Sequence, residues 1–263
     1  MIVITGASSG IGLACAKKFI ASGSYVVMAA RDEQKLIELS KIQESQKSKF
    51  ITVKCDVSNE QECINLIEQT IKQFGKIDVL INNAGISMRA LFNTLDLEVI
   101  NKVMQINFWG LVYCTKYALP YLLASKGSVV GISSVAGKKG LPGRSGYSAS
   151  KFAMEGFLES LRTENLKTGL HVLVACPGFT ASNIRNKALN AQGIEQGESP
   201  RDEAGMMSAD EVADRIYYAI VGRKRDLLLT TNGKLTVWLN KFFPSIMDKI
   251  VFKHMSKEEG SPF

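Results

Sequence analysis

Short runs of apolar, often β-branched residues alternate along the chain with longer stretches of helical periodicity. Runs that are apolar throughout, rather than at every second position, are typical of strands buried on both faces. The pattern therefore favours a parallel sheet with helices on both faces. Strands are predicted at 2–5, 25–30, 50–54, 77–82, 128–133, 170–176 and 226–230, and helices at 10–22, 33–44, 59–74, 97–124, 147–168 and 209–222.

The regular alternation predicts a single Rossmann-type domain, a doubly wound parallel sheet of about seven strands. We expect this domain to span residues 1–233, including a long loop at 178–208 that is rich in Asn, Gln, Gly and Glu. A loop of this length in a compact domain is usually functional, often as a lid over a site. Residues 234–263 are predicted to be an amphipathic extension, interrupted at Pro244 and packed on the same domain.

Composition narrows the class of protein. The chain has 263 residues, of which 46% are apolar and 22% charged, as in globular proteins. Five cysteines without a CxxC pair indicate reduced thiols, so we expect a cytoplasmic protein. Only two histidines are present, His171 and His254, and we expect no metal site. The net charge of +7 comes without a basic stripe, so no nucleic-acid partner is predicted.

A glycine-rich turn, Thr5-Gly-Ala-Ser-Ser-Gly-Ile-Gly12, follows the first strand and opens the first helix. Glycines let backbone amides approach a pyrophosphate, and the N-terminus of a helix favours negative charge. An ordinary strand-to-helix turn is the alternative, but its place after the first strand of an α/β pattern favours a dinucleotide. The residues expected to bind it are Gly6, Ser8, Ser9, Gly10, Ile11 and Gly12.

The end of the second predicted strand bears on which dinucleotide is used. An acidic residue near this point usually holds the ribose of NAD, whereas an arginine accommodates the 2′-phosphate of NADP. Arg31 follows the small residue Ala30, and we interpret Asp32 as the N-cap of the next helix. The sequence therefore predicts a preference for NADP(H) over NAD(H).

Tyr147 and Lys151 lie near the start of a predicted helix and share one face of it. An ammonium beside a phenol favours the phenolate and lowers its pKa, which would make Tyr147 a general acid or base. The YxxxK spacing alone is common, so its weight depends on the other motifs.

Together the motifs resemble those of the short-chain dehydrogenase/reductase family. They occur in order between residues 2 and about 222: Thr-Gly-Ala-Ser-Ser-Gly-Ile-Gly at 5–12, Asn-Asn-Ala-Gly at 82–85, Asn107, Ser133-Ser134, and Tyr-Ser-Ala-Ser-Lys at 147–151. The resemblance implies that domain 1–233 binds a dinucleotide and is catalytic. It also implies hydride transfer between a nicotinamide and a carbonyl or secondary alcohol.

The resemblance also implies roles for single residues. Tyr147 would exchange a proton with the substrate oxygen, and Lys151 would bind the nicotinamide ribose and lower the pKa of the tyrosine. Ser134 would hydrogen-bond the substrate oxygen, and Asn107 would support a water-linked proton relay to Lys151. Further cofactor contacts are implied for Asp56 and Val57 at the adenine, Asn83, Ala84 and Gly85 on the floor, and Pro177, Gly178 and Thr180 at the nicotinamide.

The substrate is less well defined. Phe179, Ile184, Met206 and Met207 suggest apolar walls near Leu141, whereas Arg144 and Arg185 suit an anionic group. The C-terminal extension resembles that of membrane-associated reductases of lipophilic carbonyls, which favours a lipophilic ketone or aldehyde. One alternative is a 3-oxoacyl-thioester reductase. Another is a non-catalytic, dinucleotide-sensing protein, which the intact tyrosine, lysine and serine disfavour.

The predicted ligand is a small-molecule carbonyl or alcohol. Two further features of the sequence concern other partners, namely further copies of this chain and a membrane surface. The predicted helices 97–124 and 147–168 resemble the family's dimer-forming pair, so a homodimer or homotetramer is expected. The aromatic and lysine-rich segment 234–255 has the composition of a peripheral membrane contact. We favour the other interpretation, in which this segment packs over the substrate pocket or against a partner subunit.

Overall fold

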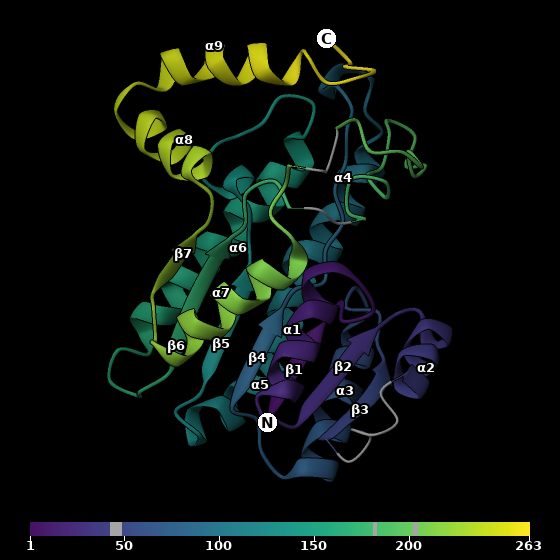
Figure 1. Ribbon diagram of the computed structural model, residues 1–263, viewed down its shortest axis with the longest axis vertical. Helices are drawn as coiled ribbons and strands as arrows, with labels where there is room; N and C mark the ends of the chain where they lie inside the picture. Colours follow the sequence, from purple (N-terminus) through teal and green to yellow (C-terminus); the bar gives the residue numbers. More distant parts are fainter. Residues whose placement is uncertain (43–48, 181–182, 202–204) are drawn as a thin grey trace.

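The computed structural model describes residues 1–42, 49–180, 183–201 and 205–263, without the side chains of 39–42. Within these residues seven parallel strands form one sheet in the order β3-β2-β1-β4-β5-β6-β7 (Figure 1), which confirms the predicted fold class. The strands are β1 (Ile2–Thr5), β2 (Val26–Ala30), β3 (Phe50–Lys54), β4 (Val79–Asn82), β5 (Ser128–Ile132), β6 (His171–Cys176) and β7 (Asp226–Leu228).

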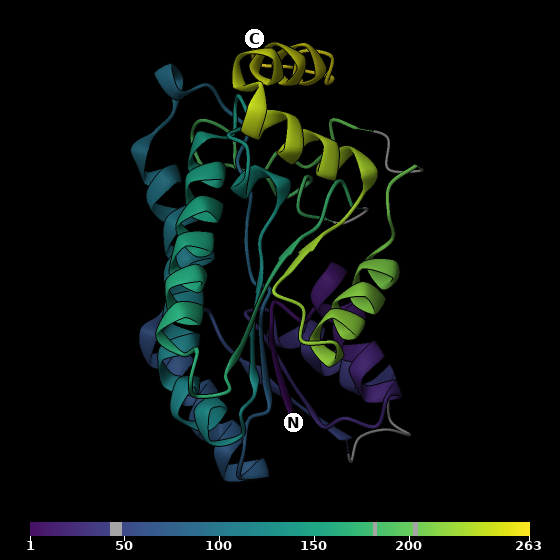
Figure 2. The same ribbon diagram turned by 90° about the vertical axis from the view of Figure 1, so that its left-hand side faces the viewer.

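Helices cover both faces of the sheet (Figure 2). One face carries α1 (Gly10–Ala21), α2 (Glu33–Ile42) and α7 (Ala209–Val221), and the other carries α3 (Glu60–Phe74), α5 (Gly110–Ala124) and α6 (Ser145–Glu164). Successive strand residues belong to opposite cores, because side chains alternate across a strand: Ile4 packs with the first set and Val3 with the second. This explains why the strands are apolar throughout.

The predicted helix 97–124 is three elements in the structure. Its first part is α4 (Leu97–Met104), followed by a π-helical turn at Gln105–Trp109 and then α5. The apolar pattern runs through the turn without a break, so the sequence gives no sign of it. Single π-turns inside helices often occur at functional sites, and this one places Asn107 in the fully buried interior.

The last predicted strand, 226–230, is shorter in the structure and ends at Leu228. Thr230 has left the strand with φ of +64° and caps the next helix by accepting a hydrogen bond from Gly233 N. The predicted helix 33–44 extends to Ile42, and residues 43 and 44 lie outside the described residues. Predicted helix 147–168 begins at Ser145 and ends at Glu164.

The carboxyl ends of the strands lie at one edge of the sheet, on the side toward the C-terminal helices α8 (Thr231–Phe242) and α9 (Pro244–Met255) (Figure 1). The strand order changes direction between β1 and β4, and ligands of open α/β sheets bind in the crevice at this point. In the described residues of 178–208 the structure has isolated bridges, Thr180 with Met207 and Leu189 with Met88 and Glu195, and no helix or full strand. The fold therefore places the site between the strand ends, this loop and α8–α9.

Candidate active site

A cleft of about 620 Å³ lies at the carboxyl ends of the strands. It brings together most of the predicted site residues, although they are far apart in the sequence. Those lining it are Gly6, Ser8, Ser9, Gly10, Ile11, Arg31, Asp56, Val57, Asn83, Ala84, Gly85, Ser134, Tyr147, Lys151, Pro177, Gly178 and Thr180. Gly12 and Asn107 do not line the cleft. Both lie behind the residues that form its wall.

The glycine turn is held in place by its neighbour strand. Asn83 Nδ2 donates to Thr5 O at 2.9 Å and to Gly6 O at 3.1 Å, and Thr5 Oγ1 accepts from the backbone N of Asn83 and of Ala84, both at 3.1 Å. Gly6 has φ of +65°. A Cβ at Gly12 would lie 2.3 Å from Gly6 O, so this glycine permits the turn to pack rather than lining the cleft.

The end of β2 contributes one exposed cation to the rim of the cleft. Arg31 is exposed and lines the cleft beside buried Ala30. Asp32 Oδ1 accepts a hydrogen bond from Lys35 N at 3.0 Å, in the first turn of α2. The prediction that Asp32 caps this helix is therefore confirmed, and its carboxylate is engaged with its own helix.

Asp56 and Val57 border the cleft directly after β3 and Cys55. Asp56 Oδ1 accepts from Ser58 N at 2.9 Å and from Ser58 Oγ at 2.7 Å, and Asp56 N donates to Glu62 Oε2 at 2.8 Å. These contacts fix the loop that carries the residues implied at an adenine ring.

Tyr147 and Lys151 occupy the first two turns of α6 and point into the cleft. Lys151 Nζ lies 5.7 Å from the centroid of the Tyr147 ring and donates to Ile132 O at 2.8 Å. Burial lowers the pKa of Lys151 to about 8. The ammonium is therefore held at the end of β5 in an environment that weakens its hold on the proton.

The pKa of Tyr147 differs in direction from the sequence expectation. Burial raises it, and this outweighs the lowering by a side-chain hydrogen bond with Ser134 and by the charges of Arg144 and Arg185. Lys151 is not among the groups that lower the pKa of Tyr147. The charges that lower it are those of Arg144 and Arg185, and burial outweighs them. Tyr147 is thus a protonated phenol at neutral pH, suited to donating a proton.

Asn107 joins two parts of the site from behind. Its Oδ1 accepts from Ile86 N at 2.8 Å, and its Nδ2 donates to Ile86 O and to Ser150 Oγ, both at 2.9 Å. Ser150 Oγ in turn donates to Tyr147 O at 2.7 Å. Asn107 therefore fixes the backbone after β4 against the first turn of α6, while its role in a proton relay stays a prediction.

The adjacent serines have separate partners. Ser134 Oγ accepts from Ala136 N at 3.2 Å, at the start of the 3-10 turn Val135–Gly137, and the residue lines the cleft. Ser133 also lines the cleft, but its Oγ donates to Glu155 Oε1 at 2.6 Å, whereas the side-chain hydrogen bond of Tyr147 is with Ser134. This supports the assignment of Ser134 as the serine next to Tyr147.

Glu155 is a residue that the sequence analysis missed. Its Oε1 also accepts from Cys176 Sγ at 3.4 Å, its Oε2 pairs with Lys138 Nζ at 2.5 Å, and its charge acts to raise the pKa of Lys151. Burial, with Glu155, raises the pKa of Cys176 to about 12, so this thiol is a neutral packing group. The available signal was its position four residues after Lys151, on the same helix face.

The substrate end of the cleft is lined by Leu141, Arg144, Phe179, Ile184 and Arg185, as expected. Met206 and Met207 instead line a neighbouring pocket, which shares Phe179 with the cleft. The wall of the cleft thus combines apolar side chains with two guanidinium groups.

Comparison with known proteins assigns the family. The family model for short chain dehydrogenases matches residues 1–193. Dehydrogenase/reductase SDR family member 7B of Mus musculus is 36% identical over 267 residues, which cover 99% of this chain and 83% of that protein. The SDR family protein 7-like of Dictyostelium discoideum is 32% identical, over 97% of this chain and 82% of that protein. The chain therefore belongs to the short-chain dehydrogenase/reductase family of oxidoreductases.

Solved structures agree with this assignment. A short-chain dehydrogenase/reductase from Burkholderia phymatum in complex with NAD has a TM-score of 0.83 and 25% identity, over 93% of this chain and 94% of that chain. An alcohol dehydrogenase from Thermococcus sibiricus, complexed with 5-hydroxy-NADP, has the same fold, with a TM-score of 0.76 and 22% identity over 87% of this chain and 94% of that chain.

Proposed function

We propose that the protein is an NADP(H)-dependent oxidoreductase that transfers a hydride between the nicotinamide and a carbonyl or secondary alcohol. The observation that carries this proposal is the placement of Ser134, Tyr147 and Lys151 in the same cleft as the glycine turn. A binding protein that only sensed a dinucleotide would need the turn but not this trio.

The residues present fit a dinucleotide. The glycine turn lines the cleft, and Ser9, the N-cap residue of α1, makes no side-chain capping bond, so the helix N-terminus remains available to an anion. The nicotinamide, when bound, supplies or accepts the hydride. The chain itself would orient the substrate oxygen with Ser134 and Tyr147 and donate the phenolic proton to it, while Lys151 holds its ammonium against the ribose.

Arg31 supports NADP(H) rather than NAD(H) as the preferred cofactor. It stands at the cleft rim where the second strand ends, and the carboxylate of the next residue, Asp32, accepts from Lys35 N. A 2′-phosphate would therefore meet an arginine that offers a planar fork of donors. The two structural neighbours were solved with an NAD and an NADP-type ligand, so this choice depends on the residues of this chain.

For the substrate we propose a lipophilic ketone or aldehyde. Leu141, Phe179 and Ile184 supply apolar wall at the substrate end, and the aromatic helices α8 and α9 lie beyond it. Reduction of a 3-oxoacyl thioester is the second candidate, because the arginines Arg144 and Arg185 at the same end would suit its polar carrier.

A homodimer or homotetramer is proposed from exposed aromatic side chains on the α5–α6 side. Trp109 is 43% exposed and Phe152 is 47% exposed, and Trp109 stacks on Tyr113 with centroids 5.7 Å apart. Such rings on neighbouring helices form an apolar surface suited to a two-fold contact. Light scattering at micromolar concentration should therefore give twice or four times the chain mass, and a monomer would contradict this.

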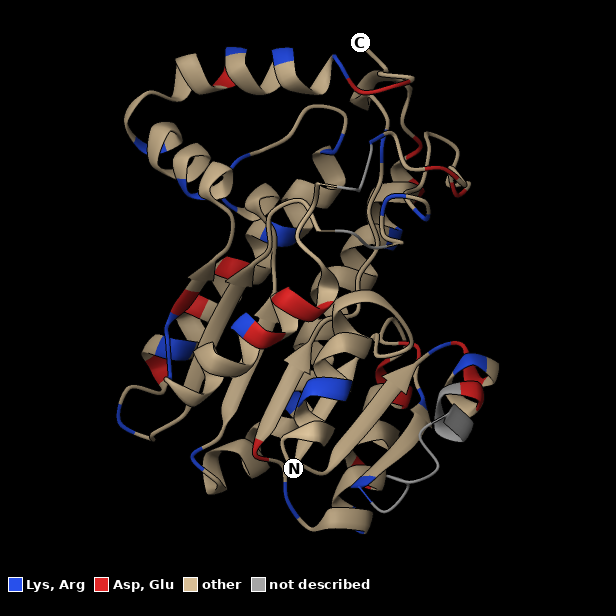
Figure 3. Cartoon of the chain, in the orientation of Figure 1, with Lys and Arg blue, Asp and Glu red and all other residues tan. Residues whose placement is uncertain are grey.

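The remaining proposals concern location and partners. All five cysteines are buried and free, which supports a reducing, cytoplasmic location. Basic and acidic residues are interspersed over the described ribbon (Figure 3), which supports the absence of a nucleic-acid partner.

Of the helices in the described ranges, none has the length and hydropathy needed to cross a bilayer. The described side chains include no cluster placed to hold a metal.

The proposal is tested with a panel of ketones, aldehydes and one acetoacetyl thioester, each mixed with NADPH or NADH while absorbance at the reduced nicotinamide band is followed. We expect oxidation of NADPH with lipophilic carbonyls, faster than with NADH. A preference for the thioester would favour the second candidate. No oxidation with any member of the panel, although NADPH binds, would favour a non-catalytic protein.

A further inference from the structure

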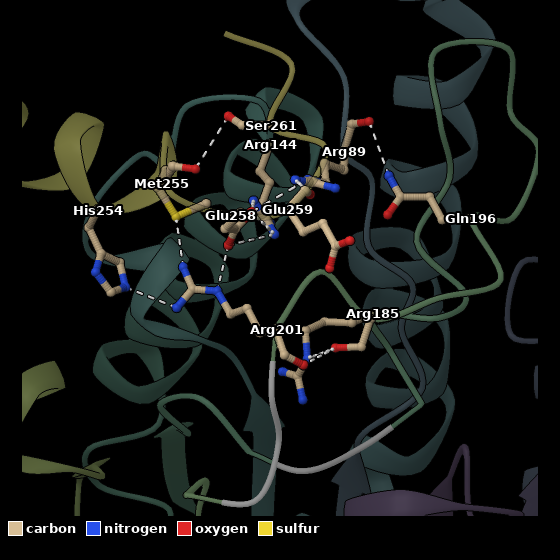
Figure 4. Close-up of polar contacts among 11 residues, drawn as sticks. Arg89, Arg144, Arg185, Gln196, Arg201, His254, Met255, Glu258, Glu259 and Ser261 are labelled. Carbon is tan, nitrogen blue, oxygen red and sulfur yellow. Dashed lines mark hydrogen bonds and ion pairs between the residues drawn. The ribbon is translucent and has the colours of Figure 1, made fainter.

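Glu258 lies in the turn that follows α9, and its carboxylate is buried, with the side chain 4% exposed. Arg201 Nε lies 2.5 Å from its Oε1, and Arg144 Nη2 lies 3.4 Å from Oε1 and 3.2 Å from Oε2. Arg89 Nε is 3.4 Å from Oε2, an ion-pair distance without hydrogen-bond geometry. Figure 4 shows the three guanidinium groups around this one carboxylate.

The three arginines come from separate segments around the substrate end of the cleft. Arg89 follows β4, Arg144 directly precedes α6, and Arg201 belongs to the long loop at 178–208. Arg201 also stacks on Phe179, with its guanidinium carbon 4.0 Å from the ring centroid, and Phe179 lines the cleft. Glu258 is therefore a common ion-pair partner of these three segments.

Glu258 is also connected to both arginines that act on Tyr147. Arg144 lines the cleft three residues before the tyrosine and binds Glu258 directly. Arg185 Nε donates to Ser199 Oγ at 3.3 Å, and Ser199 Oγ donates to the backbone O of Arg201 at 3.0 Å. The positive charges of Arg144 and Arg185 act to lower the pKa of Tyr147.

The charge balance explains why this contact matters. Glu258 is ionised, because the arginines hold its pKa below its usual range although burial opposes them. Other charged or titratable groups near it are exposed: His254, which contacts Arg201 Nη1 at 2.9 Å, Lys257 and Glu259. Without the Glu258 carboxylate, three largely buried guanidinium groups would lie close together with no negative charge among them. Removing one partner of a buried ion pair is destabilising because it leaves the other charge without a counter-charge.

We propose that Glu258 is a positioning residue of the active site: it balances the charge of Arg144 beside Tyr147 and joins the C-terminal segment to the wall of the substrate end. The inference rests on the proposed function, since it assigns Tyr147 the proton transfer. In this arrangement the negative charge of Glu258 offsets part of the effect that the positive charge of Arg144 has on the Tyr147 hydroxyl. The C-terminal segment therefore belongs to the catalytic apparatus rather than only covering the fold.

The test compares Glu258→Gln with Glu259→Gln. Glu259 is the adjacent exposed carboxylate, and only its backbone O binds Arg89, at 2.6 Å from Nη2. The first readout is the titration of Tyr147 itself, measured as phenolate absorbance of each protein minus that of the same protein carrying Tyr147→Phe. In Glu258→Gln the field of Arg144 at the phenol is no longer offset, so Tyr147 should titrate at lower pH than in the native protein. In Glu259→Gln it should titrate as in the native protein.

The second readout is catalysis with a carbonyl identified by the panel. Glu258→Gln should raise KM by roughly tenfold, the size expected for loss of a charge-assisted contact, with a smaller change in kcat. The alkaline limb of the pH profile, which reflects Lys151, should stay where it is. Glu258→Asp should recover part of the change in KM.

Two outcomes would overturn the inference. If Glu258→Gln lowered Tm but left the Tyr147 titration and KM native, Glu258 would have a structural role alone. If Glu258→Gln did not fold, Arg201→Gln would decide: it leaves Glu258 to offset Arg144 more fully, so Tyr147 should titrate at higher pH, and an unchanged titration would overturn the inference. Since the titration needs no turnover, an inactive native protein would count against the proposed function separately.

Discussion

The two ends of the cleft are built in different ways. At the nucleotide end, the glycine turn after β1 is held by Asn83 and Thr5, that is, by hydrogen bonds between adjacent strands and their backbone. At the substrate end, Glu258 draws together Arg89, Arg144 and Arg201 through side-chain ion pairs. The first end depends on close backbone packing, and the second depends on charge.

This difference has consequences for how each end responds to change. A backbone turn held by close packing tolerates no added atoms: a Cβ at Gly12 would lie only 2.3 Å from Gly6 O. Such packing involves no titrating group and is insensitive to salt and pH. Ion pairs respond to charge and pH, although their burial limits screening by salt. Substrate binding should therefore respond most to the removal of a charge, and cofactor binding to added bulk at the glycine turn.

The largest expected effect is at the junction of the two ends. Tyr147→Phe removes one hydroxyl from a buried phenol, so folding and NADPH affinity should stay close to native. Loss of general acid catalysis should lower kcat by roughly 10²- to 10⁴-fold. Steady-state rates, paired with NADPH binding measured by fluorescence, check this. A rate within a few-fold of native would mean that another group donates the proton.

Arg31→Ala tests the charged contact proposed for the 2′-phosphate at the nucleotide end. We expect NADPH affinity to fall about ten- to a hundred-fold, because charge-assisted hydrogen bonds to a phosphate contribute about 1.5–3 kcal/mol each, while NADH affinity stays nearly constant. Dissociation constants from tryptophan quenching at fixed salt measure both.

The matched control for this change is the pair Ala30→Asp with Arg31→Ala. A carboxylate at position 30 should accept the free ribose hydroxyls and repel the phosphate, which would reverse the preference. If Arg31→Ala weakened both cofactors alike, Arg31 would be a surface charge with no part in discrimination.

The pH profile of reduction should reflect Lys151. Burial lowers its pKa to about 8, so its ammonium form is lost as the pH rises through about 8, whereas burial raises the pKa of Tyr147 and keeps that proton in place. The reduction rate at low substrate should be flat near neutral pH and fall by about tenfold per unit above the pKa of Lys151. Persistence of the same limb in Lys151→Met would assign it to another group.

The smallest expected effect concerns the outer surface of the C-terminal helices. Trp238 and Phe242 are each 56% exposed on α8, with Phe243 beside them, and Met247, Val251 and Met255 of α9 pack inward against Leu141 and Phe263. We expect little retention of the protein by liposomes that contain anionic lipid. Strong co-sedimentation with a blue shift of Trp238 fluorescence, both reversed by the double change Phe242→Ser and Phe243→Ser, would instead establish a membrane contact.

The nucleotide end could be predicted largely from sequence because its features are local. The strands are short apolar runs, the glycine turn is continuous in sequence, and Tyr147 and Lys151 are one helical turn apart. The capping role of Asp32 follows from its place directly before α2. Each depends on neighbours within a few residues, which periodicity and spacing can reveal.

The ion pairs of the substrate end could not be predicted in the same way. Glu258 lies 57 residues from Arg201 and 114 from Arg144, and an ion pair between distant positions leaves no periodic trace. The π-turn that buries Asn107 was missed because the apolar pattern continues through it. The direction of the Tyr147 pKa was missed because burial depends on the whole fold around the phenol.

The most direct test of the central claim is transfer of deuterium from NADPH labelled at the reactive hydrogen of nicotinamide C4. The native protein is mixed with this cofactor and a carbonyl from the panel, and the product alcohol is analysed by mass spectrometry and NMR. The account predicts one deuterium per alcohol, on the former carbonyl carbon, with the hydroxyl proton drawn from solvent. An alcohol that carries no deuterium, or a cofactor that binds in the cleft and is never oxidised, would contradict it.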